Sequence, residues 1–450
     1  MKIIIDSQKK MQKIEGWGTS LCWWANVLGT WKNEKKIDQI SDLLFDDVKG
    51  LGMNIIRYNI GGGENPPNKK NLRFGADIPC YQSGPDEWNM DADAGQRKFL
   101  FKARDRGVDI FEAFSNAPPV WMTKNRSSAG AKDRRNNLKD DMYGDFAEFM
   151  TEVIKYFKEN FDLVFNSLSP FNEPISCWWH SDNDQEGCFF DTDKQMEIIR
   201  ETAERLRKKD LLQTTIAAPE GWSVFDSIYS YGCYSDEIKS CVSQLNTHAY
   251  SGDKKSRLFL KSIAKKDNKK LWMSEVSYGG INPHNHSDMD SALDLAGNIH
   301  DYLNEMNSTA WIYWQAVEDE EGKHNHGLIH ADFKGSEEFW ITRQYYAFSN
   351  YSKFIKKNFT IIESTSSNIV SAYNKQLQVL IIVAINRENT VEDCTFDLSS
   401  FDFKDSKVEV FRTSVSENLA RLKDEHIKDC KLRIKLKEIS VTTFSIREGT

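Results

Sequence analysis

Long apolar runs are missing from this 450-residue sequence. No stretch approaches the roughly 18 consecutive apolar residues of a membrane-spanning helix. The opening Met-Lys-Ile-Ile-Ile-Asp turns polar too soon for a signal peptide. We therefore expect a soluble protein with no membrane partner. Taken literally, the sequence predicts a cytoplasmic protein, or a secreted one if an export signal was trimmed from it.

An excess of basic residues is also missing. The formal net charge is −8 at pH 7, and no segment concentrates Lys and Arg on one stretch of chain. Neutralising the phosphates of a nucleic acid requires a concentrated basic surface. The charge therefore argues against a nucleic-acid partner.

The eight cysteines include no Cys-x-x-Cys pair, which excludes the spacing of a zinc ribbon. In a chain of this size we expect reduced and partly buried thiols rather than a disulfide framework. One pair, Cys177 and Cys188, flanks a single loop and could be bridged if the protein is secreted.

A metal-binding set is not evident either. Two His-x-His pairs, His284/His286 and His324/His326, have a spacing that would permit a metal. No cysteine or clustered carboxylate set completes a shell around them. We expect a polar loop or a sugar contact at these positions, with no metal and no cofactor.

What the chain does contain is an alternation of strand-like and helix-like segments. Eight runs are rich in apolar or β-branched residues, at 14–20, 53–60, 108–115, 165–171, 214–219, 244–250, 270–276 and 309–315. Between them, segments such as 36–51 and 141–157 carry apolar residues at three- and four-residue intervals. Eight β-then-α repeats predict an α/β fold, a closed (β/α)8 TIM barrel, over residues 14–352.

The pattern changes after residue 352. Residues 353–450 contain short strand-like segments separated by polar turns, which predicts an antiparallel β-sandwich beside the barrel. The first strand-like segment, residues 2–6, has no evident place in the barrel. We assign residues 1–13 together with 353–450 to the side domain. Two domains also suit a chain longer than most single domains.

Two glutamates lie where barrel strands are expected to end. Glu173 stands in Leu168-Ser-Pro-Phe-Asn-Glu-Pro174, and Glu275 stands in Leu271-Trp-Met-Ser-Glu-Val276. An isolated Glu after a strand is commonly a solvated strand end or a salt-bridge partner. A pair at the active-site face of a barrel instead suggests cleavage of a glycosidic bond. That reaction needs one carboxyl group to protonate the leaving oxygen and another to attack the anomeric carbon.

Other polar and aromatic residues follow the remaining predicted strands. Pro174 stops its strand, which leaves Asn172 placed to donate its side-chain amide to a substrate hydroxyl. Further strand-end motifs are Gly16-Trp-Gly-Thr-Ser-Leu-Cys-Trp-Trp-Ala25, Asn246-Thr-His-Ala-Tyr250 and Trp311-Ile-Tyr-Trp-Gln315. Thirteen tryptophans provide many flat apolar faces. The C–H faces of sugar rings stack on such faces, although most aromatic residues in any protein fill the core.

With these motifs the sequence strongly resembles glycoside hydrolase family 30, a retaining family built on the eightfold barrel with a side β-sandwich. Within the family, the insert Cys177-Trp-Trp-His-Ser-Asp-Asn-Asp-Gln-Glu-Gly-Cys188 is similar to that of the endo-β-1,6-galactanase branch. The resemblance implies an endo-acting hydrolase that cuts β-1,6-galactan side chains of arabinogalactan by double displacement. Its alternatives are another β-glycan (β-1,6-glucan, β-glucoside, β-fucoside or xylan) and a non-catalytic carbohydrate-binding protein.

The resemblance also implies roles for single residues. Glu173 corresponds to the acid/base and Glu275 to the nucleophile, with their carboxyl groups about 5–5.5 Å apart. Arg57 matches an arginine that keeps the nucleophile ionised, although it could instead form an ordinary salt bridge at the rim of the core. Tyr250 matches a residue that hydrogen-bonds the nucleophile, and His248 is a neighbour in the same polar network.

Trp314 matches the tryptophan on which the sugar at the cleavage site stacks. Further candidates for sugar contacts, each of which could instead pack in the core, are Trp24, Trp121, Trp178 and Trp179. Trp178 and Trp179 occupy a polar loop that has little core to fill. Glu186 either meets a hydroxyl of a neighbouring sugar or caps this loop. We expect a monomer whose partner is an oligo- or polysaccharide.

Overall fold

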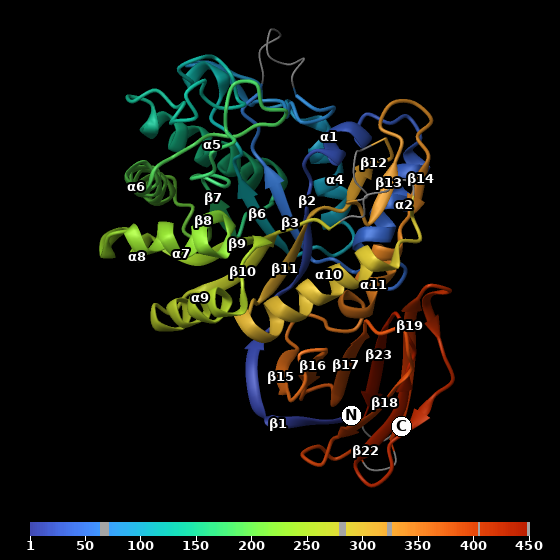
Figure 1. Ribbon diagram of the computed structural model, residues 1–450. Helices are drawn as coiled ribbons and strands as arrows, with labels where there is room; N and C mark the ends of the chain where they lie inside the picture. Colours follow the sequence, from blue (N-terminus) through green and yellow to red (C-terminus); the bar gives the residue numbers. More distant parts are fainter. Residues whose placement is uncertain (64–71, 279–284, 322–325, 404–405, 448–450) are drawn as a thin grey trace.

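The computed structural model describes residues 1–63, 72–278, 285–321, 326–403 and 406–447. Figure 1 shows a barrel wrapped by helices and, below it, a β-sheet domain to which both ends of the chain contribute. The predicted fold class, a TIM barrel with a side β-domain, is confirmed. The boundaries at residues 13/14 and 352/353 stay a prediction.

Eight parallel strands close the barrel, and each predicted run overlaps one of them. Around the barrel their order is β10 (Lys270–Glu275), β11 (Ala310–Gln315), β2 (Gly16–Ser20), β3 (Ile55–Asn59), β6 (Ile110–Phe114), β7 (Ser167–Ser169), β8 (Thr215–Ser223) and β9 (Val242–Ser251). The strands are almost entirely buried, because helices cover them outside and side chains fill the barrel inside.

Helices surround the barrel. They are α1 (Trp24–Leu28), α2 (Glu34–Phe45), α4 (Ala94–Arg104), α5 (Tyr143–Phe161), α6 (Thr192–Lys208), α7 (Val224–Cys233), α8 (Asp236–Cys241), α9 (Lys254–Lys266), α10 (Met289–Asp301) and α11 (Arg343–Ser352), with a 3-10 turn at Val120–Met122 and a π-helical turn at Tyr302–Met306. Where β8 passes into α7, Ser223 and Asp226 form a reciprocal capping box. This cap fixes the backbone directly after Trp222, the penultimate residue of β8.

The barrel interior has an apolar layer below a polar one. Ile55, Ile110 and Trp272 belong to a small buried cluster inside the barrel. Residues two positions further along a strand point to the same side of the sheet. Arg57 and Glu112 therefore also face the interior, one layer closer to the carboxyl ends of the strands. The charges of the barrel thus gather below its active-site face.

The side domain is a ten-stranded sheet folded around its own core. The strand order is β20 (Glu417–Arg421), β19 (Lys407–Ser414), β23 (Ser440–Arg447), β17 (Val379–Asn386), β16 (Ile369–Asn374), β15 (Thr360–Ser364), β1 (Lys2–Lys13), β18 (Glu392–Asp397) and β22 (Lys431–Leu436), with β21 (Glu425–His426) paired to β19. One pairing departs from the predicted antiparallel pattern, since β1 and β18 are parallel. The direction of β1 is imposed by its continuation into the barrel rather than by a hairpin.

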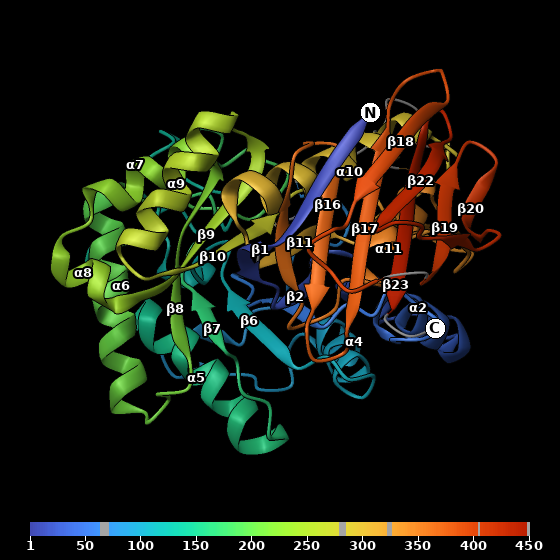
Figure 2. The same cartoon turned by 90° about the horizontal axis from the view of Figure 1, so that it is seen from below.

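Helices α10 and α11 lie between the barrel and the side sheet in Figure 1, and in Figure 2, seen from below, they lie behind the strands of this sheet. Asn350 of α11 donates its side-chain amide to the Thr413 hydroxyl of β19 at 2.7 Å. Its backbone carbonyl accepts from the Thr443 hydroxyl of β23 at 2.8 Å. These buried hydrogen bonds hold the sheet against the barrel.

Two small sheets lie outside the barrel and the side domain. One joins β12 (Val317–Asp319), β13 (Ile329–Ala331) and β14 (Phe339–Ile341) after the eighth barrel strand, and the other joins β4 (Gln82–Gly84) and β5 (Glu87–Trp88). None of the helices in the described part of the chain combines the length and the apolar character of a membrane span.

Candidate active site

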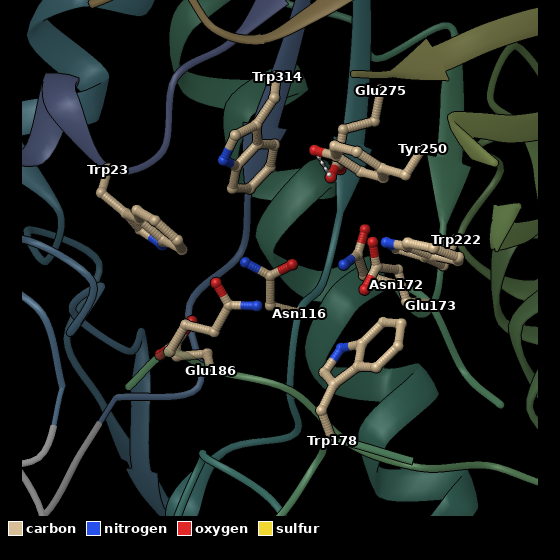
Figure 3. A pocket seen from close by; sticks show the side chains of 11 residues that line it. Trp23, Asn116, Asn172, Glu173, Trp178, Glu186, Trp222, Tyr250, Glu275 and Trp314 are labelled. Atoms are coloured by element: carbon tan, nitrogen blue, oxygen red, sulfur yellow. Dashed lines mark hydrogen bonds between the residues drawn. The ribbon is translucent and has the colours of Figure 1, made fainter. Parts of the chain in front are cut away.

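A cavity of about 280 Å³ lies at the carboxyl ends of the barrel strands (Figure 3). It combines carboxylates, amides and indole rings. The lining residues are Trp23, Asn116, Asn172, Glu173, Trp178, Gln185, Glu186, Trp222, Tyr250, Glu275 and Trp314. The structure thus brings together Glu173 and Glu275, which are 102 positions apart in the sequence.

The two carboxyl groups approach each other closely. The Nδ1 atom of His248 lies 3.1 Å from Oε1 of Glu173 and 3.4 Å from Oε1 of Glu275. One oxygen of each carboxyl group and one imidazole nitrogen all lie within 4.8 Å of one another. The nearest oxygens of the two carboxyl groups are therefore at most 4.8 Å apart.

The backbone of Glu173 is held from both sides. Its φ angle is +45°, in the left-handed region that non-glycine residues seldom adopt. Its N–H donates to the carbonyl of Glu220 at 2.9 Å, and its carbonyl accepts from the Trp179 indole at 2.8 Å. These bonds stabilise an unusual conformation that turns the Glu173 side chain into the cavity.

Two donors hold the Glu275 carboxylate. Arg57 donates from Nη1 to Oε2 at 2.9 Å, and the Tyr250 hydroxyl donates to Oε1 at 3.1 Å. Charge-assisted hydrogen bonds of this kind stabilise a carboxylate and fix its orientation. Each oxygen of Glu275 therefore accepts a hydrogen bond from a different donor, and the residue is buried.

Below the cavity lies a buried charge network, of which Glu112 and Glu220 were not predicted from the sequence. The Arg57 guanidinium contacts Glu112 at 3.0 Å and Glu220 at 3.3 Å, and all three side chains are fully buried. Burial raises the pKa of Glu112 to about 7. Burial also acts to raise the pKa of Glu220, but Arg57 and His248 outweigh it and lower this pKa to about 2. The available signal was a charged residue inside the run 108–115 for Glu112 and one directly after the run 214–219 for Glu220.

His248 links the network to Glu173. Burial acts to lower the pKa of His248, but Glu275, Glu173 and Glu220 outweigh it and raise this pKa to about 10. The imidazole is therefore charged near neutral pH. It donates from Nδ1 to Glu173 at 3.1 Å and from Nε2 to Glu220 at 3.0 Å.

Glu173 is electrostatically suited to hold a proton. Burial raises the pKa of Glu173, His248 opposes this rise, and the nearby Glu275 adds to it. Because Oε1 accepts from His248, the proton belongs on the other oxygen, Oε2. The site therefore combines a carboxyl group that retains a proton with a carboxylate held by Arg57.

Indole rings form two walls of the cavity. Trp178 packs edge-on against Trp222 with 5.4 Å between ring centroids, and Trp222 stacks on Tyr250 at 6.1 Å. Trp23 and Trp314 pack edge-on at 5.3 Å. Figure 3 shows this second pair across the cavity from Trp222 and Trp178. Such walls suit a ligand with flat apolar faces.

The structure corrects the assignment of Trp24. Its side chain is fully buried, donates to the Ser20 carbonyl at 2.9 Å and packs against Phe99, so it does not reach the cavity. Its neighbour Trp23 lines the cavity instead. The backbone N–H of Trp23 donates to the Gln315 side chain at 2.7 Å, which anchors this wall.

Two more predicted sugar contacts lie elsewhere. Trp179 is fully buried and supports the Glu173 carbonyl through its indole N–H, so only Trp178 of the pair lines the cavity. Trp121 borders a different cavity, beside Trp88 and Glu148. Both are corrections to the set predicted from the sequence.

Several buried polar atoms that line the cavity have no hydrogen-bond partner among the described residues. They are Asn116 Oδ1, Asn172 Oδ1 and the indole nitrogen of Trp23. Glu186 lines the same cavity and accepts from Asn59 at 3.3 Å. Buried polar groups are normally paired. Unpaired ones here are suited to a ligand rich in hydroxyl groups.

The structure describes both cysteines of the predicted loop pair and only some of the histidines in the two His-x-His pairs. Cys177 and Cys188 are both free thiols, the first exposed and the second buried. His284 and His324 lie outside the described residues. No cysteine or clustered carboxylate set was expected beside the histidine pairs. The structure corrects this for His286, which contacts the Glu320 carboxylate at 2.9 Å.

A family model and several relatives are similar to this chain. The model of O-glycosyl hydrolase family 30 matches residues 1–285. An endo-beta-1,6-galactanase of Hypocrea rufa is 29% identical over 421 residues, which cover 88% of this chain and 83% of that protein. An exo-beta-1,6-galactobiohydrolase of Bifidobacterium longum subsp. longum is 27% identical over 414 residues, which cover 68% of this chain and 26% of that protein.

A solved structure shows the same fold. The catalytic domain of GH30 xylanase C from Talaromyces cellulolyticus superposes with a TM-score of 0.77, covering 99% of this chain and 100% of that one. At 17% identity this likeness extends to the architecture of barrel and side sheet.

Proposed function

Because the chain belongs to O-glycosyl hydrolase family 30, we propose that it is a retaining endo-hydrolase of β-1,6-galactan with Glu173 as acid/base and Glu275 as nucleophile. The observation that carries the proposal is the close pair of differently held carboxyl groups in a tryptophan-walled cavity. Membership of a family of hydrolases sets aside the non-catalytic binding protein that the sequence left open.

In the first step, Glu275 attacks the anomeric carbon and the bond to the leaving oxygen breaks. Glu173 transfers the proton on Oε2 to that oxygen, so the leaving sugar departs as an alcohol. A covalent ester then joins Glu275 to the glycosyl group. Arg57 and Tyr250, which bind the two oxygens of Glu275, hold the nucleophile in place for this attack.

In the second step, Glu173 removes a proton from a water molecule, which attacks the same carbon and releases Glu275 as a carboxylate. The electrostatics support this change of role. The charge of Glu275 contributes to the raised pKa of Glu173, and the ester removes that charge. The pKa of Glu173 therefore falls when a base is needed and rises again when the ester is hydrolysed.

The preference for β-1,6-galactan is supported by the two relatives whose names carry β-1,6-linked galactose. It is also supported by Trp178, which the insert between Cys177 and Cys188 places on the cavity wall. A 1,6-linkage adds a rotatable bond to every glycosidic unit. A rigid aromatic wall can fix the path of such a flexible chain at low entropic cost.

A panel of β-linked glycans tests the function. We expect oligosaccharides from β-1,6-galactan, little release from β-1,6-glucan or xylan, and a first product with the β configuration by proton NMR. A preference for β-1,6-glucan would overturn the galactan assignment but leave the hydrolase intact. A first product with the α configuration would overturn the retaining mechanism.

The Trp178→Ala variant tests the wall. Loss of one stacking face should lower kcat/KM on β-1,6-galactan about 10- to 100-fold, because a buried aromatic contact contributes roughly 1.4–2.7 kcal/mol. The same variant should lower kcat/KM less on an aryl β-galactoside, which fills only the cleavage subsite and there loses only the Trp178 hydrogen bond to Glu173. The Trp121→Ala variant, in the separate cavity, is the matched control and should affect neither substrate. Equal losses on both substrates in Trp178→Ala would contradict a role in binding the chain.

A further inference from the structure

A second cluster of ionisable side chains lies outside the catalytic cavity. His286 precedes α10, Glu320 follows β12, and His330 is the central residue of β13. Oε2 of Glu320 lies 2.9 Å from Nε2 of His286 and 3.1 Å from Nδ1 of His330. All three ligand atoms lie within 4.8 Å of one another.

These distances suit a small tetrahedral ion. Zinc binds histidine nitrogen and carboxylate oxygen at about 2.0–2.2 Å, so neighbouring ligand atoms of a tetrahedron lie about 3.3–3.5 Å apart. The two contacts of Glu320, at 2.9 and 3.1 Å, are about 0.2–0.6 Å shorter than that edge. Calcium and magnesium instead prefer shells of oxygen ligands.

The three ligands are held on ordered backbone. The N–H of Glu320 donates to the Ala331 carbonyl at 2.9 Å, which extends the pairing of β12 with β13. The carbonyl of His286 accepts from the N–H of Arg343 at 2.7 Å, at the start of α11. A site whose ligands are fixed before binding pays less ordering entropy on metal binding.

The surroundings of the cluster also suit a metal. Trp340 of β14 stacks on the His286 ring, with 5.8 Å between centroids and 20° between planes. The side chain of His330 is 1% exposed, whereas those of His286 and Glu320 are 24% and 16% exposed. One side is thus shielded, while the other admits an ion and a water ligand.

We propose that His286, Glu320 and His330 bind one divalent transition-metal ion, with Zn²⁺ as the preferred ion and water as a further ligand. The ion ties the segment before α10 to the small sheet of β12, β13 and β14. This sheet carries Glu318, which hydrogen-bonds Gln315, the residue that anchors Trp23. The proposed role is therefore structural support of the cavity wall on that side.

Sequence spacing does not reveal this set, because its members come from three separate segments. A His-x-His pattern directs attention to His284 and His286 as partners. The structure pairs His286 with His330 instead, 44 positions later in the sequence. Only the strand pairing that places Glu320 beside Ala331 makes the three converge.

Titration of the EDTA-treated full-length chain with ZnCl₂ by calorimetry tests the proposal. We expect one equivalent to bind with a micromolar or lower Kd and to raise Tm. Co²⁺ in place of Zn²⁺ should give the visible absorption of a tetrahedral site. Loss of one of three ligands, in His286→Gln or Glu320→Gln, should weaken binding at least about 100-fold.

Two control variants locate the ion. His426→Gln removes an exposed histidine of β21 and should bind zinc like the wild type. Glu275→Gln addresses the other close set of ligand atoms, formed by Glu173, His248 and Glu275, and should also bind like the wild type. Loss of binding in Glu275→Gln with retention in Glu320→Gln would place the ion in the catalytic cavity and overturn the proposal.

The absence of stoichiometric binding to the wild type would likewise overturn it, as would unchanged affinity in both ligand variants. Thermal melts of the metal-free proteins separate lost binding from lost folding. His286 is partly exposed, so His286→Gln should retain the Tm of the metal-free wild type. Its affinity decides the question even if Glu320→Gln fails to fold.

Discussion

Replacing Glu275 by Gln is expected to lower kcat on β-1,6-galactan at least about 10,000-fold. An amide has no negative charge with which to attack the anomeric carbon, so the glycosyl ester cannot form. The side chain keeps its shape, and Arg57 retains Glu112 and Glu220 as partners. Glycan affinity, measured by calorimetry on the variant, should therefore stay within a few-fold of the wild type.

The matched control for this variant is Glu305→Gln. Glu305 also contacts an arginine, Arg257, at 2.7 Å, but it lies outside the catalytic cavity. Its replacement removes an Arg-paired carboxylate without touching the proposed chemistry, so kcat should stay within about twofold. Retention of a tenth or more of the wild-type kcat in Glu275→Gln would show that another group is the nucleophile.

Glu173→Ala is expected to lower kcat on the polysaccharide about 100- to 10,000-fold, the usual contribution of a general acid and base. An aryl β-galactoside with a good leaving group needs no protonation, so its ester should form rapidly and accumulate. Azide can enter the space left by the side chain and attack this ester. The expected result is a rise in turnover with added azide and a β-galactosyl azide product, detected by mass spectrometry.

The dependence of kcat/KM on pH tests the role of Glu173 independently. Glu173 must be protonated for the first step, and burial raises its pKa above the usual range of a glutamate. The kcat/KM of the wild type should therefore be retained below this raised pKa and lost as the pH rises through it. The alkaline decline should disappear in Glu173→Ala with the aryl substrate. A decline that persists unchanged in this variant would assign the titration to a different group.

The sequence by itself determined the fold and the two central carboxyl groups. Eight apolar runs separated by amphipathic segments predict a barrel because strand and helix periodicities are local properties of the chain. Once strands are placed in a parallel barrel, their carboxyl ends must meet at one face. Glu173 and Glu275, each close to the end of such a run, were therefore expected at the same face of the barrel.

Only the tertiary structure decided which other side chains belong to the cavity. Trp23 and Trp24 are adjacent in the sequence, yet the first lines the cavity and the second is buried. The direction of a side chain at a strand-to-helix turn depends on local dihedral angles that composition does not reveal. Likewise, Trp178 lines the cavity, whereas the adjacent Trp179 is buried.

The charge network and the histidine cluster were equally out of reach of sequence periodicity. Glu112 and Glu220 contact Arg57 across the barrel interior, and Glu320 meets His286 across two separate segments. Contacts of this kind depend on strand register and on the closure of the barrel. Local pattern thus determines which elements form, whereas the pKa values and hydrogen bonds of the site arise from neighbours that only folding brings together.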